Sequence, residues 1–128
     1  MALIRRGKTK GLTLSSILVA VCGQSSDDQA VKLACNLLHP QDGNLFVVYV
    51  IEMDRKFPLD AEIASATAKG ETILSHMENI TKPYRFSTRA ELLQSREAGL
   101  AIVQEAVNRN VDAVVLGIPY LEKYGSFS

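Results

Sequence analysis

The chain has 128 residues, of which 47% are hydrophobic and 22% are charged, and its formal net charge is zero. A chain of this length forms one domain around a single core, and its composition is that of a folded α/β or α protein rather than of a disordered tail. The neutral charge argues against non-specific nucleic-acid binding, and no apolar run reaches the roughly 18 residues of a membrane span.

The beginning of the chain is more basic than the rest. Residues 1–26 carry four bases and no acid, which leaves 10 bases against 14 acids in the remaining residues. A basic start before an apolar run resembles a secretory signal, but glycines and paired serines interrupt it and no small-residue cleavage site follows. We therefore expect a basic, poorly ordered arm over residues 1–14 and one domain over residues 15–128.

The two cysteines, Cys22 and Cys35, form neither a metal-binding nor a disulfide pattern. They lie 13 residues apart, with no CxxC spacing and no matching pair of histidines. This cysteine usage fits a reducing compartment, so we expect the protein to be cytoplasmic.

The first half of the domain predicts a strand, a helix and a second strand. Ile17–Val21 is too apolar to alternate, as in a strand buried on both faces of a parallel sheet. Gln24–Asp28 then supplies helix-capping side chains and first-turn acids, before an amphipathic helix that runs to about Leu38. After a short turn, Leu45–Ile51 is again continuously apolar and rich in β-forming residues.

A long helix is predicted after the second strand. Glu52 to Leu59, which includes a proline, is predicted to be a loop, and the helix follows from about Asp60. Its apolar residues recur at alternating spacings of three and four, which indicates a stripe facing the core rather than a cofactor motif. Pro83 ends the helix.

The remaining pattern predicts an edge strand, a helix and a buried strand. Tyr84 to Leu92 alternates, which suits a strand with one exposed face at the edge of a sheet. Ser95 can cap the next helix. Ala113–Leu116 is then an apolar strand that ends at Gly117, and residues 118–128 are predicted to be loop-like.

The predicted order is β-α-β-α-β-α-β, an α/β fold with a mainly parallel sheet, because each crossover contains a helix. The continuously apolar strands at 17–21 and 113–116 are expected side by side at the centre of the sheet. In open sheets of this kind, ligands bind beyond the carboxyl ends of the strands. The candidate site therefore comprises residues 22–26, 50–53 and 117–120.

The motifs of several enzyme classes are absent from the sequence. It contains neither a GxxxxGK[ST] phosphate loop nor a GxGxxG dinucleotide motif after the first strand. Cys22 stands where a cysteine phosphatase keeps its nucleophile, but the position six residues later, where that chemistry needs an arginine, is Asp28. We interpret Cys22 as a small packed side chain and Asp27 and Asp28 as helix-capping acids. His39 and His76 are interpreted as surface or boundary residues rather than bases.

Several stretches taken together resemble the universal stress protein family. Ile17–Val21, with the polar turn and Ala-rich helix after it, is similar to the family's opening, and Leu45–Val50 is similar to its second strand. Ala101–Ala106 and Val111–Gly117 resemble a late helix and the fourth strand. The resemblance covers about residues 15–117.

This resemblance implies a single three-layer, doubly wound domain with the strand order 3-2-1-4. In the family, another helix and a fifth strand that commonly pairs subunits come next, and the sequence stops before both. The resemblance therefore implies that the domain is incomplete at its C-terminal end and that the complete protein is a homodimer.

The resemblance also implies a degenerate nucleotide site. In the nucleotide-binding branch an aspartate follows the first strand on the adenine side, and Cys22 stands there in this chain, whereas the apolar contact at Val50 is kept. The family's glycine motif begins at Gly117, but Tyr120 replaces its second glycine and its third would fall beyond the last residue. Pro119 has no amide to offer a phosphate. The cofactor-binding positions implied by the resemblance are Ala20, Val21, Cys22, Val50, Leu116, Gly117, Pro119 and Tyr120.

Three functions remain open. The first is a non-enzymatic stress-response or regulatory domain with a degenerate adenine-nucleotide site, for which we expect no cofactor, no metal and no catalytic residue. The second is an ATP- or AMP-binding universal stress protein with slow hydrolysis. The third is a soluble regulatory module of a membrane transporter, for which the basic arm is the only hint. In each case we expect an unidentified protein partner, without nucleic-acid binding or membrane insertion.

Overall fold

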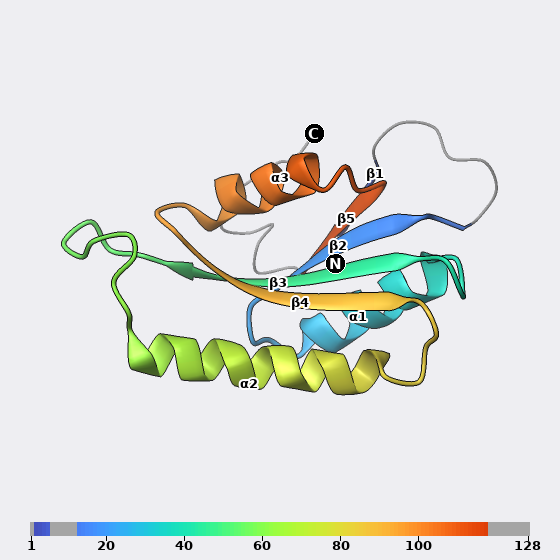
Figure 1. Ribbon diagram of the computed structural model, residues 1–128, viewed down its shortest axis with the longest axis horizontal. Helices are drawn as coiled ribbons and strands as arrows, with labels where there is room; N and C mark the ends of the chain where they lie inside the picture. Colours follow the sequence, from blue (N-terminus) through green and yellow to red (C-terminus); the bar gives the residue numbers. More distant parts are fainter. Residues whose placement is uncertain (1, 6–12, 118–128) are drawn as a thin grey trace.

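The architecture is an open sheet with helices on both faces (Figure 1). The computed structural model describes residues 2–5 and 13–117. In these residues the elements are β1 (Ala2–Arg5), β2 (Ser16–Val21), α1 (Ser26–Leu37), β3 (Asn44–Glu52), α2 (Ala64–Thr81), β4 (Ser87–Ser95), α3 (Ala98–Asn108) and β5 (Ala113–Leu116).

Four parallel strands form the main part of the sheet. The order is β1-β5-β2-β3-β4, with β2 paired to β5 on one side and to β3 on the other. In this register Val19 of β2 lies beside both Val47 and Val115. The predicted parallel sheet, its 3-2-1-4 order and the adjacent first and fourth predicted strands are therefore confirmed. The physical basis is the unbroken apolar sequence of β2, whose last five residues are fully buried.

The N-terminal segment contains a strand that the sequence pattern did not predict. Ala2–Arg5 runs antiparallel to β5, with Ala2 paired to Leu116 and Arg5 paired to Ala113. The expectation of a poorly ordered arm is therefore wrong for these four residues. The reason is that β5 has a second hydrogen-bonding edge, which an extended segment of the same chain can satisfy.

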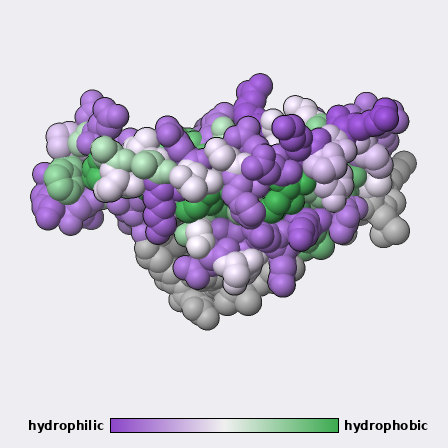
Figure 2. Space-filling view, turned by 90° about the horizontal axis from the view of Figure 1, so that it is seen from below, coloured by the Kyte–Doolittle hydropathy of each residue, from purple (hydrophilic) through white to green (hydrophobic). Residues whose placement is uncertain are grey.

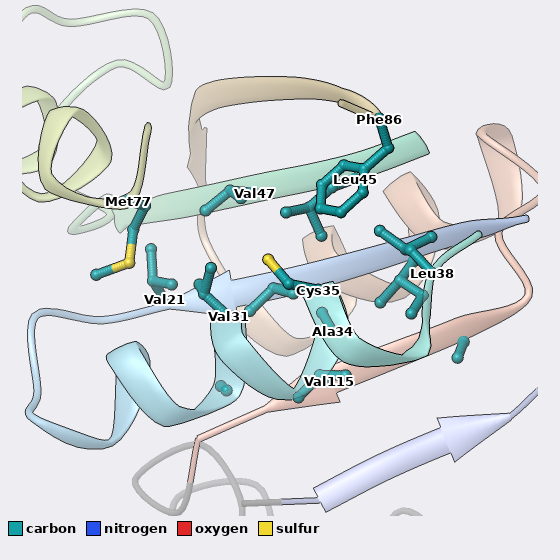
Figure 3. Packing of buried hydrophobic residues seen from close by; sticks show 14 of the residues in the cluster. Val21, Val31, Ala34, Cys35, Leu38, Leu45, Val47, Met77, Phe86 and Val115 are labelled. Carbon is teal, nitrogen blue, oxygen red and sulfur yellow. The ribbon is translucent and has the colours of Figure 1, made fainter. Parts of the chain in front are cut away.

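The helices divide the core into two layers. Helices α1 and α2 cover one face of the sheet and α3 covers the other (Figure 1). Figure 3 shows the first layer, in which Val21, Val47 and Val115 of the strands meet Val31 of α1. On the opposite face α3 buries small and aliphatic side chains, namely Ala98, Ala101, Ile102 and Ala106. Each strand contributes side chains to both layers, because successive side chains point to opposite faces of the sheet.

Helix α2 approaches the sheet most closely at Gly70. A Cβ atom at this position would lie 2.3 Å from Leu92 Cδ1 and 2.8 Å from Tyr49 Cδ1. Of the predicted core-facing stripe, Gly70 and Met77 are buried and Ile73 and Ile80 pack against the core, so the stripe is confirmed. Leu74 is also buried, although it was not part of the predicted stripe. Figure 2, seen from the side of α2, shows a mainly hydrophilic surface with small hydrophobic patches. Among the described residues, no helix is both long and apolar enough to cross a membrane.

Helix α2 begins later than the sequence pattern predicts. It starts at Ala64 rather than near Asp60. The side-chain amide of Gln94 donates hydrogen bonds to the carbonyl oxygens of Leu59 (2.9 Å) and Ala61 (2.8 Å). These contacts from β4 hold the preceding segment in a non-helical path, which local sequence cannot reveal.

Strand β4 also begins later than predicted, at Ser87 rather than Tyr84. The N–H of Tyr84 donates to the carbonyl of Thr81 at 3.0 Å and closes a turn at the end of α2. The strand starts only where the N–H of Ser87 donates to the carbonyl of Gly43, also at 3.0 Å. The alternation of apolar residues therefore begins three residues before the first residue of the strand.

The first turn of α3 is capped from another strand. Ser95 was predicted to cap this helix, but its hydroxyl accepts the N–H of Glu97 and donates to the carbonyl of the same residue. The N–H of Ala98 instead donates to Glu52 Oε2, at the end of β3, at 3.0 Å. Similarly, Ser25 at the start of α1 makes no side-chain capping hydrogen bond. The prediction that Ser95 caps α3 is therefore wrong.

Replacing Glu52 with alanine should lower the free energy of unfolding by about 1 kcal/mol, because the first turn of α3 loses its acceptor. Glu52→Gln should lose less, since its amide oxygen can still accept the Ala98 N–H. Urea titration followed by circular dichroism measures both variants, with the exposed Glu97→Ala as control. Equal losses for the alanine and glutamine variants would contradict a capping role.

Candidate ligand site at the carboxyl edge of the sheet

The structure brings the three predicted segments to one edge of the sheet. Because β2, β3 and β5 are parallel, the segments that follow them at residues 22–26, 50–53 and 117 lie at the same end. Gly117 is buried there. Pro119 and Tyr120 lie outside the described residues.

The predicted site residues divide between the two faces of the sheet. Ala20, Val50 and Leu116 are buried in the layer under α3, and Cys22 packs against that layer. Val21 points the opposite way, into the layer under α1 and α2. Strand alternation therefore places Val21 apart from the others, although it is their neighbour in sequence.

A buried carboxyl group organises the loop that follows β2. Asp27 is fully buried, and its Oδ2 accepts the backbone N–H groups of Cys22 (3.1 Å), Gly23 (2.7 Å) and Gln24 (3.1 Å). Gly23 has a φ of +87°, a left-handed conformation that glycine adopts without strain. Asp27 therefore joins the end of the strand to the first turn of α1.

Asp27 is the residue whose role the sequence pattern missed. Its interpretation as a first-turn acid is correct in position, since it lies in the first turn of α1. Its partners, however, are amides before the helix rather than those of the helix itself. The available signal was an acid four residues after a glycine, and that spacing alone does not reveal burial.

Burial controls the protonation of the groups at this loop. It raises the pKa of Asp27 above the usual 3.8, although the three backbone amides pull in the other direction. Burial, reinforced by the nearby Asp27, raises the pKa of the Cys22 thiol to about 11, and burial raises that of Cys35 to about 11 as well. Both thiols are therefore neutral at pH 7, which agrees with the interpretation of Cys22 as a packed side chain.

The loop after β2 forms an anion-binding arrangement that is already occupied. Successive backbone N–H groups that converge on one point attract phosphates and carboxylates. Here the point of convergence is Asp27 Oδ2. An external phosphate would have to displace this carboxyl group before these amides could bind it.

A hollow of about 340 Å³ lies between this loop and α2, beside the start of α1. Asp28 on α1 and His76 on α2 form part of its wall and contact each other, with His76 Nε2 3.0 Å from Asp28 Oδ1. Both side chains are partly exposed, as the surface interpretation of His76 requires. Among the described residues, no group of three potential metal ligands comes together.

A comparison with known protein families identifies the family of this chain. The model of the universal stress protein family matches residues 13–121. This chain belongs to the universal stress protein family. The predicted membership and the predicted three-layer fold are thereby confirmed.

Solved structures share the fold of this universal stress protein at low sequence identity. A universal stress protein from Burkholderia pseudomallei has a TM-score of 0.63 and 21% identity, over 84% of this chain and 83% of that one. The universal stress protein from Archaeoglobus fulgidus has a TM-score of 0.60 and 18% identity, over 80% and 74%. Protein Rv1636 from Mycobacterium tuberculosis has a TM-score of 0.55 and 16% identity, over 82% and 71%. A search of curated proteins gives no match.

Proposed function

We propose that this chain is a non-enzymatic stress-response or regulatory domain whose adenine-nucleotide site is degenerate. The observation that carries the proposal is the position of the Asp27 carboxyl group, which accepts hydrogen bonds from the backbone amides of Cys22, Gly23 and Gln24. Because these amides are already bonded within the chain, they are not available to a nucleotide.

The residue at the end of β2 supports the same proposal. Cys22 stands where the nucleotide-binding branch of the family has an aspartate, and a neutral thiol is a poor hydrogen-bond acceptor. A hydrogen bond left unmade in this way costs on the order of 1–3 kcal/mol, or about one to two decades of affinity. Tyr120 and Pro119 depart from the family's phosphate-binding sequence as well.

Isothermal titration of the chain with ATP and magnesium tests this proposal. We expect weak or absent binding and no release of phosphate from ATP. Sub-micromolar binding would instead support the alternative of an ATP-binding universal stress protein. Cys22→Asp restores the missing carboxylate and should tighten any residual binding, whereas Cys35→Asp, which places the same group inside the core, should not.

We further propose that the domain acts as a homodimer in the cytoplasm. Dimers are common among universal stress proteins, and neutral, unpaired thiols suit a reducing compartment. Sedimentation equilibrium of the full chain over a wide concentration range measures the assembly directly. A monomer at millimolar concentration would contradict it.

A further inference from the structure

We propose that two copies of this chain pair through the open edge of β4, as antiparallel strands related by a two-fold axis at Ala90. This inference rests on the homodimer proposed above and names the surface that forms it. The dimer expected from the family resemblance would instead use a strand beyond β5. In this chain, the edge of β5 is already paired with β1.

Strand β4 is the long unpaired edge of the sheet. Its nine residues pair with β3 on one side, and within the described residues no strand pairs with its other side. None of the residues of β4 is fully buried, whereas five of the six residues of β2 are. At the opposite edge, β1 offers only four residues. A strand partner can therefore form more backbone hydrogen bonds at β4 than at β1.

The sequence of β4 is complementary to itself about Ala90. In an antiparallel pair centred on this residue, Arg89 lies directly opposite the partner's Glu91, and Glu91 lies opposite the partner's Arg89. Directly opposed residues share one face of a sheet, so the opposite charges meet at both ends of the axis. The small side chain of Ala90 lies on the axis itself, where a larger one would meet its own copy. The pairing is thus isologous, as a two-fold interface requires.

The two charged side chains are placed to make these contacts. Both lie on the α3 side of the sheet, since Leu93, two residues after Glu91, packs in the layer under α3. Glu91 is held by an ion pair with Arg109, and Arg109 also contacts Glu105 at 2.9 Å. Glu91 keeps a third of its side chain exposed. Arg89 is exposed and forms no ion pair within the described part of the chain.

This arrangement lowers the cost of association at Glu91. A side chain that is already held loses little rotamer freedom when it gains a second partner. The carboxylate has two oxygens and can accept from Arg109 and from the partner's Arg89 together. The edge therefore presents one fixed negative group and one free positive group, spaced to match a second copy.

The test is a charge-swap experiment in full-length chains. Arg89→Glu places like charges opposite each other at both ends of the axis, and Glu91→Lys does so with the opposite sign. We expect each variant alone to weaken the dimer at least about tenfold in sedimentation equilibrium, since each cross-strand pair changes from attraction to repulsion. An equimolar mixture of the two variants restores both opposite-charge contacts and should recover the wild-type dissociation constant. Lys32→Glu, on the exposed side of α1, is the matched control and should change nothing.

Several outcomes would overturn the inference. If the wild type is a dimer and Arg89→Glu leaves its dissociation constant unchanged, the β4 surface is wrong while the homodimer stands. If Arg89→Glu increases association, the charge guards the edge against pairing instead of promoting it. A monomeric wild type would contradict the homodimer itself. Because Arg89 is exposed and unpaired, its variant does not threaten the fold, and circular dichroism verifies this for both variants.

Discussion

Replacing Asp27 with alanine should lower the free energy of unfolding by about 3 kcal/mol, because it removes the shared acceptor of three backbone amides. Water can reach the exposed Gly23 and Gln24 and replace part of what they lose, whereas the half-buried Cys22 is less accessible. Chemical denaturation at pH 7 measures the loss. The chain around the end of β2 should also become more mobile, which amide hydrogen exchange of these three residues would report.

Two further variants distinguish the role of Asp27 from a general effect of charge. Asp27→Asn keeps one acceptor oxygen and should lose less than alanine. Asp28→Ala removes a partly exposed neighbour and should change stability by no more than about 0.5 kcal/mol. In Asp27→Asn the pKa of Cys22 should fall from about 11 but stay above 9.0, since burial is its largest cause. An unchanged Cys22 titration would show that the carboxyl group does not act on the thiol.

Gly70→Val should lower the free energy of unfolding by about 3 kcal/mol, because overfilling a packed contact costs more than the improved helix propensity returns. The first added carbon would already lie 2.3 Å from Leu92 Cδ1 and 2.8 Å from the ring of Tyr49. The leucine can rotate away, but the ring is held between α2 and the sheet, so the helix itself must shift. Thermal and urea unfolding both measure this effect.

The matched control for Gly70→Val is Ser75→Val, on the exposed side of the same helix. It introduces the same β-branched side chain without the contact, and because serine and valine have similar helix propensities it should change stability by less than about 1 kcal/mol. Combining Gly70→Ala with Leu92→Ala should give a smaller loss than the sum of the two single variants, since the shorter side chain makes room. Strict additivity in this double-mutant cycle would contradict a close contact between the two positions.

The candidate site was only partly predictable from the sequence. The position of the site at the carboxyl ends of the strands followed from the order of elements, because parallel strands end at the same side of a sheet. The role of Asp27 did not follow, since the same acid could cap a helix in solvent or accept bonds from a preceding loop. Val21 faces one side of the sheet while Ala20 and Cys22 face the other, because successive side chains of a strand alternate. The predicted set of site residues did not take this alternation into account.

Some positions were mispredicted because their partners lie far away in the chain. The cap of α3 comes from Glu52 on β3, and the late start of α2 is imposed by Gln94 on β4. A local serine or an apolar period gives no information about such partners. The strand at Ala2–Arg5 was missed for a similar reason, because only the open edge of β5 gives it a place to pair.

The sequence by itself determined the parallel sheet and its central strands. Three continuous apolar runs can avoid water only when both of their faces are covered, and intervening helices permit only parallel crossovers. Only the tertiary structure decided which side chains accept hydrogen bonds from the backbone N–H groups of the loops. Hydrogen bonds such as those to Asp27 and Glu52 depend on positions accurate to a fraction of an ångström, whereas hydrophobic burial depends only on which residues are apolar.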